Sequence, residues 1–414
     1  MHKLAISLTI TLALALAAGA SPAARSAEFE NPPVLQASQI LPASVVKGPY
    51  HTVNEKVTND GFLNYYQVRS KWRNYQVVSN PALKILVAEF PAIAAMEKVD
   101  AGDTFAKSVG DSGEKMVKGV KNLFKDPKGT MEGAGEGLGR LFDRGEEMQR
   151  SQPSQYEDSR GKQISGFSNS KRRIAAKFGV DVYSSNPVLQ EQLERLAWAD
   201  YGGGIGLAAA TSVVPGMAGL TITVSGSTRL LNDVIDTTPP AELRIANRQH
   251  LLQMGVDPDT TELFINNSVF TPRQQTGVVA ALENLSGVAD RPLLIKVGNT
   301  AHTPLMAGLM AQASLLQTGY HQNVTPLKDF APVARVYYAT SKKGALVVNL
   351  PLDYVIWSAR LAGLVQGLEE KMGPQAPKEF WITGRFSPRA AKELESRGWK
   401  LYPASEQRLF GKQK

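Results

Sequence analysis

Two consecutive prolines, Pro239 and Pro240, follow Asp236-Thr237-Thr238 and form the strongest interruption in this 414-residue chain. Proline fixes its backbone φ and has no amide hydrogen, so neither a helix nor a central strand continues through such a pair. Residues 236–240 are therefore expected to be a linker between two domains, which a chain of this length can form. Charge divides at the same place: residues 28–240 carry 24 basic and 24 acidic side chains, and residues 241–414 carry 20 and 14.

The chain begins with the pattern of a secretory signal peptide. Met1-His2-Lys3 is a short basic start, and residues 4–18 follow without a charge and are mostly Leu, Ala and Ile. Ala18-Gly19-Ala20 then supplies the small residues of a cleavage site. The apolar stretch is shorter than the roughly 20 residues that a membrane-spanning helix needs, and a retained anchor is the alternative. Residues 1–20 are therefore expected to be removed on export.

The absence of cysteine narrows the chemistry further. It excludes disulfides, cysteine-ligated zinc, iron–sulfur clusters and thiol catalysis. With 43% hydrophobic and 20% charged residues, the composition is that of a globular protein, not of a collagen, a coiled coil or a disordered chain. An exported chain without disulfides is typical of a bacterial envelope protein, so we expect a periplasmic or secreted location. The formal charge is +8, but export argues against a nucleic-acid partner.

The part before the linker is expected to be mainly helical. Residues 21–60 are rich in Pro, Ala, Ser and Asn without a sustained period and predict an extended arm, whereas residues 61–235 predict helices. Ser79-Asn80-Pro81 and Ser185-Asn186-Pro187 each place a capping side chain before a proline, which is the signature of a helix start. Two explanations account for the shared Ser-Asn-Pro signature: a duplicated helical unit, or two helices that use the same capping residues independently.

The part after the linker, residues 241–414, is expected to be an α/β domain. Its predicted elements are helices at 242–254, 271–285 and 303–318, a buried strand at 292–297, a hairpin at 336–349, a helix at 358–372, a strand at 380–383, a helix that begins after Ser387, and a last strand at 399–402. From residue 336 onward the order is β-β-α-β-α-β, which predicts a small mixed sheet covered by helices. The fold class expected for the whole chain is therefore α+β.

Residues 202–228 form a glycine-rich apolar segment. These 27 residues contain seven glycines and no charge. The segment is long enough to cross a bilayer, but its glycines, hydroxyl side chains and central Pro215 dilute its apolar content. Three interpretations stay open: a buried glycine-rich helix followed by a strand, a segment inserted in a membrane, and an ordered loop.

A second segment, residues 113–145, has the pattern of a basic amphipathic helix. Lysines crowd the polar side of its first half, and glycines recur every four residues in its second half. Such a helix either lies on an anionic membrane surface or packs against a core with its lysines in solvent. The residues that we expect to contact a membrane or a protein partner are Lys118, Lys121, Phe124, Gly129, Gly133, Gly137, Leu138, Leu141 and Phe142.

Two short motifs resemble catalytic or cofactor signatures, and we reject both. Gly204-Ile205-Gly206-Leu207-Ala208-Ala209 matches a dinucleotide-binding loop, but a predicted helix precedes it where that mechanism needs a strand. Gly110-Asp111-Ser112-Gly113 resembles a serine-protease nucleophile, but its surroundings are predicted to be helical and lysine-rich. No cofactor is therefore expected.

The best-placed polar cluster is Asn299, Thr300 and His302, at the predicted junction of a strand and a helix. Such junctions are common site positions in α/β structures. With Asp353, these residues are the catalytic candidates of an alternative reading in which the protein is an exported hydrolase. No pair of histidines has metal-ligand spacing, so no metal is expected.

A basic run at residues 171–173 offers a further contact surface. Lys171, Arg172 and Arg173, with Lys177 nearby, are expected to be solvated or to meet phosphate groups. For an exported protein, an anionic lipid or glycan is a better partner for them than nucleic acid. The function that we expect is that of a non-enzymatic envelope protein, which acts by membrane-surface or partner contact. An exported hydrolase and an assembly subunit are the alternatives, and the oligomeric state stays open.

Overall fold

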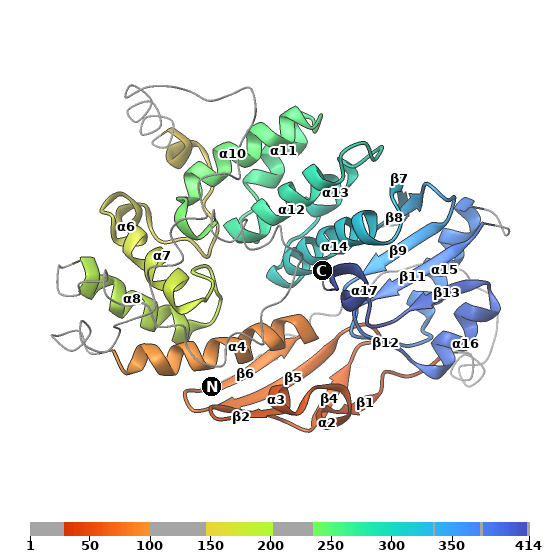
Figure 1. Cartoon of the computed structure of the whole chain (residues 1–414), viewed down its shortest axis with the longest axis horizontal. Coiled ribbons are helices and arrows are strands. Elements are labelled where there is room, and N and C mark those ends of the chain that lie inside the picture. Colours follow the sequence, from red (N-terminus) through yellow and green to blue (C-terminus); the bar gives the residue numbers. More distant parts are fainter. Residues whose placement is uncertain (1–28, 100–145, 202–234, 334–335, 373–375, 412–414) are drawn as a thin grey trace, which may run out of the picture.

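The computed structural model describes residues 29–99, 146–201, 235–333, 336–372 and 376–411 (Figure 1). The structure is α+β, as expected. The contact candidates between residues 118 and 142, the two rejected motifs and the segment 202–228 lie outside the described residues.

An antiparallel sheet forms the first part of the fold. Its strands are β1 (Val34–Gln36), β2 (Lys47–Gly48), β3 (His51–Val53), β4 (Lys56–Asn59), β5 (Asn64–Ser70) and β6 (Asn74–Val78). The order is β1-β4-β5-β3-β2, and β6 pairs with β5. In β5, Asn64, Tyr66 and Val68 are buried and alternate with exposed residues, which is the pattern of a sheet with one solvated face.

This sheet corrects the expectation for residues 34–78, where we expected an extended arm to residue 60 and helix after it. Two short helices, α2 (Ala37–Ile40) and α3 (Ala43–Val46), interrupt the strands. Most of the strands are only two to five residues long and include polar residues on their exposed positions. A period of two repeats too few times in such segments to be recognised from sequence alone.

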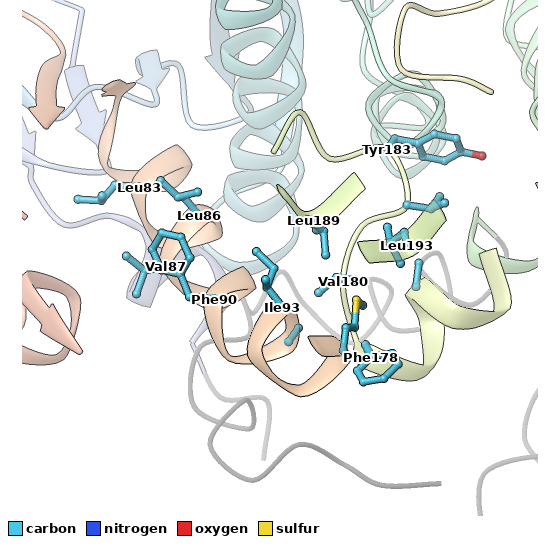
Figure 2. Close-up of a cluster of buried hydrophobic side chains, with 14 of the residues drawn as sticks. Leu83, Leu86, Val87, Phe90, Ile93, Phe178, Val180, Tyr183, Leu189 and Leu193 are labelled. Atoms are coloured by element: carbon cyan, nitrogen blue, oxygen red, sulfur yellow. The ribbon is translucent and has the colours of Figure 1, made fainter. Parts of the chain in front are cut away.

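One helix, α4 (Asn80–Glu97), packs against β6 of this sheet, and further helices pack on α4 and on one another. They are α6 (Arg160–Ile164), α7 (Phe167–Phe178) and α8 (Pro187–Tyr201). Figure 2 shows Ile93 of α4 on the side of Leu189 of α8, whereas the Phe90 ring lies on the other side of α4. There Phe90 meets the rings of His51 and Tyr75, which belong to the sheet. Both predicted helix starts are confirmed: the Ser79 hydroxyl accepts from the Ala82 amide at 3.4 Å, and the Asn186 side chain accepts from the Val188 amide at 3.1 Å.

The region after the two prolines begins with five helices. They are α10 (Pro240–Gln253), α11 (Pro258–Ile265), α12 (Pro272–Asn284), α13 (Leu293–Gly298) and α14 (Pro304–Asn323). Pro239 and Pro240 stand at the start of α10, where a missing amide hydrogen costs nothing. The predicted strand at 292–297 is wrong, because this segment is α13. A short apolar run does not distinguish a buried strand from a buried helical turn.

A second sheet, with helices on both faces, forms the C-terminal part. Its strands are β7 (Leu327–Val333), β8 (Val336–Ser341), β9 (Leu346–Leu350), β11 (Lys378–Ile382) and β13 (Trp399–Tyr402), in the order β13-β11-β9-β8-β7. The predicted β8–β9 hairpin is confirmed, and β11 runs parallel to both β9 and β13, so the sheet is mixed. Strand β7, which contains Pro332, was not predicted from the sequence.

The remaining elements complete this part of the fold. They are β10 (Tyr354–Val355), α15 (Ala359–Met372), β12 (Arg385–Phe386), α16 (Pro388–Ser396) and α17 (Glu406–Phe410). Neighbouring residues of β9 enter different cores: Val347 belongs to the core that includes residues of α14, and Val348 belongs to the core that includes residues of α15. The sheet is therefore buried on both faces, as parallel strands require.

The loop between β4 and β5 joins the N-terminal sheet to the C-terminal part. The Phe62 carbonyl accepts from the amide of Asp353 at 2.9 Å, and the Gly61 carbonyl accepts from the amide of Ile356 at 3.2 Å. The N-terminal end of the described chain docks there too, because the Glu30 carboxylate accepts from the Ser387 hydroxyl at 2.6 Å. Residues on both sides of the 236–240 segment thus contact each other directly.

Candidate functional site

Three of the four predicted catalytic residues lie in the turn between α13 and α14 and hold that turn together. The Asn299 amide donates to the carbonyl of Thr260 at 2.9 Å, and the Thr300 hydroxyl donates to the carbonyl of Val297 at 2.7 Å. His302 is exposed, and its Nδ1 lies 3.2 Å from the carbonyl of Thr300. All three side chains therefore bond to backbone carbonyls, Asn299 to α11 and the other two within their own turn.

Asp353, the fourth candidate, lies in a different environment. Its side chain is 3% exposed, and its two carboxylate oxygens accept from the backbone amides of Asn64 and Asn80, each at 3.0 Å. The two donors belong to β5 and to α4, and no described contact joins Asp353 to His302. The contacts therefore divide the four candidates between two places.

A buried polar network surrounds Asp353. The Asn64 amide donates to the Tyr66 hydroxyl at 3.1 Å and to the Asn80 side chain at 3.2 Å, and the Asn59 amide donates to the Asn64 side chain at 2.9 Å. Burial raises the pKa of Asp353 to about 6, although the two backbone amides oppose this shift. The network connects the N-terminal sheet to the segment between β9 and β10, and among the described residues no cation pairs directly with the carboxylate.

Glu89 of α4 is a second buried carboxylate without a paired cation among its described contacts. Its side chain is 4% exposed and accepts from the Ser184 hydroxyl at 2.5 Å and from the Asn186 amide at 2.9 Å. Burial raises its pKa to about 7. Because Asn186 also accepts from Val188 at the start of α8, Glu89 connects α4 to α8.

The basic run at residues 171–173 is largely buried, which corrects the expectation of a solvated surface. Lys171 is 4% exposed and pairs with Asp158 at 2.8 Å, and Arg172 is 5% exposed. Only Arg173 is well exposed, and it pairs with Asp200 at 2.6 Å. Charged side chains on neighbouring elements are buried and paired in the same way: the side chains of Arg244 and Glu157 are both buried and pair with each other. The run is thus mostly part of an internal ionic network.

A small cavity opens beside this ionic network. It is lined by residues that include Asp158, Lys171, Arg172 and Tyr183, and it encloses about 10 Å³. That is roughly the space of one water molecule, too little for an organic ligand. The Tyr183 hydroxyl is buried and has no hydrogen-bond partner within the described part of the chain. Figure 2 shows this hydroxyl directed away from the labelled aliphatic side chains.

An exposed aromatic pair occupies the C-terminal end of α8. The side chains of Trp198 and Tyr201 are 51% and 47% exposed, although both are large and mostly apolar. Their rings meet edge to face at 5.9 Å, and Trp198 also packs on the buried Phe167 at 4.4 Å. This pair was not predicted from the sequence, because the helical period of apolar residues does not show which of them stay exposed to solvent.

The described residues contain neither a metal-binding group nor a membrane span. No cluster of three His, Asp or Glu side chains occurs among them, and none of their helices is both long and apolar enough to cross a bilayer. The histidines serve local contacts instead: His51 bonds to the carbonyl of Val45 at 2.9 Å, and His250 pairs with Glu283 at 2.6 Å.

Comparisons of the chain with protein-family models, curated proteins and solved structures found no match.

Proposed function

We propose that the chain is an exported cell-envelope protein that acts by contact with a membrane surface and not by covalent catalysis. The observation that carries this proposal is the exposed pair of Trp198 and Tyr201. Tryptophan and tyrosine combine an apolar ring with a polar group, and they are enriched where one side of a surface is apolar and the other is wet.

The surroundings of the pair support a membrane contact. Lys162 lies 5.1 Å from the ring of Phe167, against which Trp198 packs, and it pairs with Glu194 at 3.0 Å. The exposed Arg173 pairs with Asp200, which lies between Trp198 and Tyr201 in the sequence. In the sequence, the uncharged segment 202–228 begins directly after Tyr201. Export itself is supported by the signal-peptide pattern of residues 1–20.

The contacts of the catalytic candidates favour a non-enzymatic role. The Asn299 side chain bonds to α11, the Thr300 side chain bonds to the end of α13, and Asp353 is enclosed in a network about the β4–β5 loop. A hydrolase would need a nucleophile or an activated water beside a base. The described contacts of these residues offer no such arrangement.

Two experiments test the proposal. The first is fractionation of the native host, followed by N-terminal sequencing of the protein, which is expected in the envelope and to begin near residue 21. An intact Met1 in the cytosol would contradict export. The second is sedimentation of the mature protein with vesicles of phosphatidylglycerol and phosphatidylcholine. We expect binding to the vesicles, and we expect the W198A/Y201A variant to bind them much less.

The matched control is Leu263→Ala. Leu263 is the most exposed of the large apolar side chains of the described residues, at 65%, and it lies on α11. This variant should bind vesicles as the wild type does. Loss of binding in both variants would show a nonspecific apolar effect, and full binding by W198A/Y201A would refute the proposed surface. If the wild type does not bind vesicles but binds an envelope protein through Trp198, the contact partner is a protein and not a membrane.

A further inference from the structure

The solvated face of the N-terminal sheet is an extended polar surface with an uneven charge. Every second residue of its strands points away from the core that α4 covers. The exposed strand residues on this face are Val34, Gln36, Lys47, Thr52, Lys56, Thr58, Tyr65, Gln67, Arg69, Asn74 and Gln76. Amides, hydroxyls and cations predominate, and none of these residues is acidic.

The pairing register places several of these side chains in one row. Lys47 lies opposite Thr52, Thr52 lies opposite Arg69, and Arg69 lies opposite Asn74. The row therefore crosses β2, β3, β5 and β6. Neighbouring strands are about 4.8 Å apart, so the row is roughly 14 Å long. This length suits an extended molecule that lies across the strands.

The three cations of this face are not neutralised by ion pairs. Lys47, Lys56 and Arg69 are exposed, and none has a carboxylate within 4 Å among the described residues. Two carboxylates lie at the border of the face: Asp60 accepts from the Tyr65 hydroxyl at 3.1 Å, and Glu55 accepts from Ser38. Because three cations lie on the face and only these two carboxylates lie at its border, its net charge is positive and attracts an anion.

The other side chains indicate which kind of anion fits. Amide and hydroxyl groups such as Gln67, Gln76 and Thr52 can donate to and accept from sugar hydroxyls. The Tyr65 ring, 38% exposed, offers an apolar plane against which a sugar ring can pack. A lipid bilayer would need large apolar side chains to insert, and Val34 and Tyr65 are the only large exposed apolar residues on these strands.

We propose that the solvated face of the N-terminal sheet, defined by Lys47, Lys56 and Arg69, binds an acidic polysaccharide of the envelope. The carboxylates of the polymer would lie near the three cations, and its hydroxyls would meet the amide and hydroxyl side chains between them. The inference rests on the proposed function only for export, which would bring the protein to such a polymer. It does not depend on Trp198 and Tyr201.

The test is a titration of the mature protein with polygalacturonate, a linear polymer of uronic acid, at low ionic strength. Neutral dextran and phosphatidylglycerol vesicles are titrated in parallel. We expect polygalacturonate to bind and dextran to bind far more weakly. The K47Q/K56Q/R69Q variant should bind polygalacturonate about tenfold more weakly, because three exposed charge contacts of modest strength are lost.

The matched control is the variant K342Q/K343Q/K400Q. It changes the net charge by the same amount at three exposed lysines, two in the β8–β9 turn and one on β13. It should bind polygalacturonate as the wild type does. Equal weakening in both variants would show a general charge effect, and an unchanged K47Q/K56Q/R69Q variant would show that the polymer binds elsewhere. Both outcomes overturn the proposal. So would a K47Q/K56Q/R69Q variant that binds vesicles more weakly than the wild type but binds the polymer equally well.

The variants also separate this inference from the proposed function. W198A/Y201A should keep its affinity for polygalacturonate, and K47Q/K56Q/R69Q should keep most of its affinity for vesicles. Urea unfolding of each variant checks that the fold is intact, and all substituted lysines and Arg69 are solvent-exposed.

Discussion

Asp353 accepts a hydrogen bond at 3.0 Å from the backbone amide of Asn80, the first residue of α4, although 273 positions separate the two residues in the sequence. The other carboxylate oxygen of Asp353 accepts from the amide of Asn64 at the same distance. One buried side chain of the C-terminal part therefore fixes both the start of a strand and the start of a helix in the N-terminal part.

Replacement of Asp353 by asparagine should destabilise the protein. The asparagine side chain keeps the size of aspartate, but its amide nitrogen cannot accept a bond, so one of the two backbone amides is left buried and unpaired. We expect the free energy of unfolding in urea to fall by about 1–3 kcal/mol. The control is Asp259→Asn, at an exposed position in the first turn of α11. Equal unfolding midpoints for D353N and the wild type would contradict the role of this contact.

The buried Glu89 should make stability depend on pH with an unusual sign. Its pKa is raised to about 7 in the folded state, from 4.5. The folded state therefore binds more protons, and stability is lost as the pH rises from about 4.5 to 7. The Glu89→Gln variant lacks this ionisation. The stability of the variant minus that of the wild type should therefore rise between pH 4 and pH 8, by up to about 3 kcal/mol.

Urea unfolding of both proteins at several pH values measures this difference. The Gln carbonyl can still accept from the Ser184 hydroxyl. Its NH2 group, however, faces the NH2 donor of Asn186 and cannot accept from it, which lowers the stability of the variant at every pH. The slope of the difference against pH is thus the diagnostic quantity. A difference that does not change between pH 4 and pH 8 would show that Glu89 does not titrate in this range.

The ion pair between Arg244 and Glu157 should be far more sensitive to substitution than an exposed pair. Both side chains are at most 4% exposed, so Arg244→Met leaves Glu157 as an uncompensated buried charge. We expect a loss of about 3–5 kcal/mol in the free energy of unfolding. Arg150→Met, which breaks the exposed pair with Glu262, should cost no more than about 1 kcal/mol. Similar losses for the two variants would argue against the burial of the ionic network.

The hydroxyls of Tyr183 and Tyr66 should respond differently to removal. Tyr183 has no described hydrogen-bond partner, so Tyr183→Phe should leave the thermal midpoint unchanged or raise it. Tyr66 bonds to Asn64 and Asn80, so Tyr66→Phe should lower the free energy of unfolding by about 1–2 kcal/mol. A clear loss in Tyr183→Phe would show instead that a molecule in the adjacent cavity, such as a buried water, bonds to this hydroxyl.

The parts of the fold that were predicted correctly depend on neighbours in the sequence. The helix starts at Ser79 and Asn186 were recognisable because a capping side chain bonds to an amide only two or three residues away. The β8–β9 hairpin was recognisable for the same reason, because its two strands are joined by a short turn at Gly344. Segments with a weak period, such as β4 and α13, were missed or assigned to the wrong class.

The candidate site depended on contacts between distant residues, and there the sequence reasoning was weaker. Lys171 looked like a surface residue of a basic run, but Asp158 and the packing of α7 hold it in the interior. Asp353 was named beside His302 as a catalytic candidate, but no described contact joins the two residues. Its two donors lie 289 and 273 positions away, in a sheet that the sequence analysis did not predict.

Local hydrogen bonds, proline geometry and the distribution of apolar residues thus specified where several helices begin, among them α10 at Pro240, and that helices and strands are both present. They could do so because each depends on backbone groups a few residues apart. Which face of the N-terminal sheet remains in solvent, which charges are buried and where Asp353 docks were decided by packing between distant elements. Burial is a property of the assembled cores, so no short segment contains that information before the chain has folded.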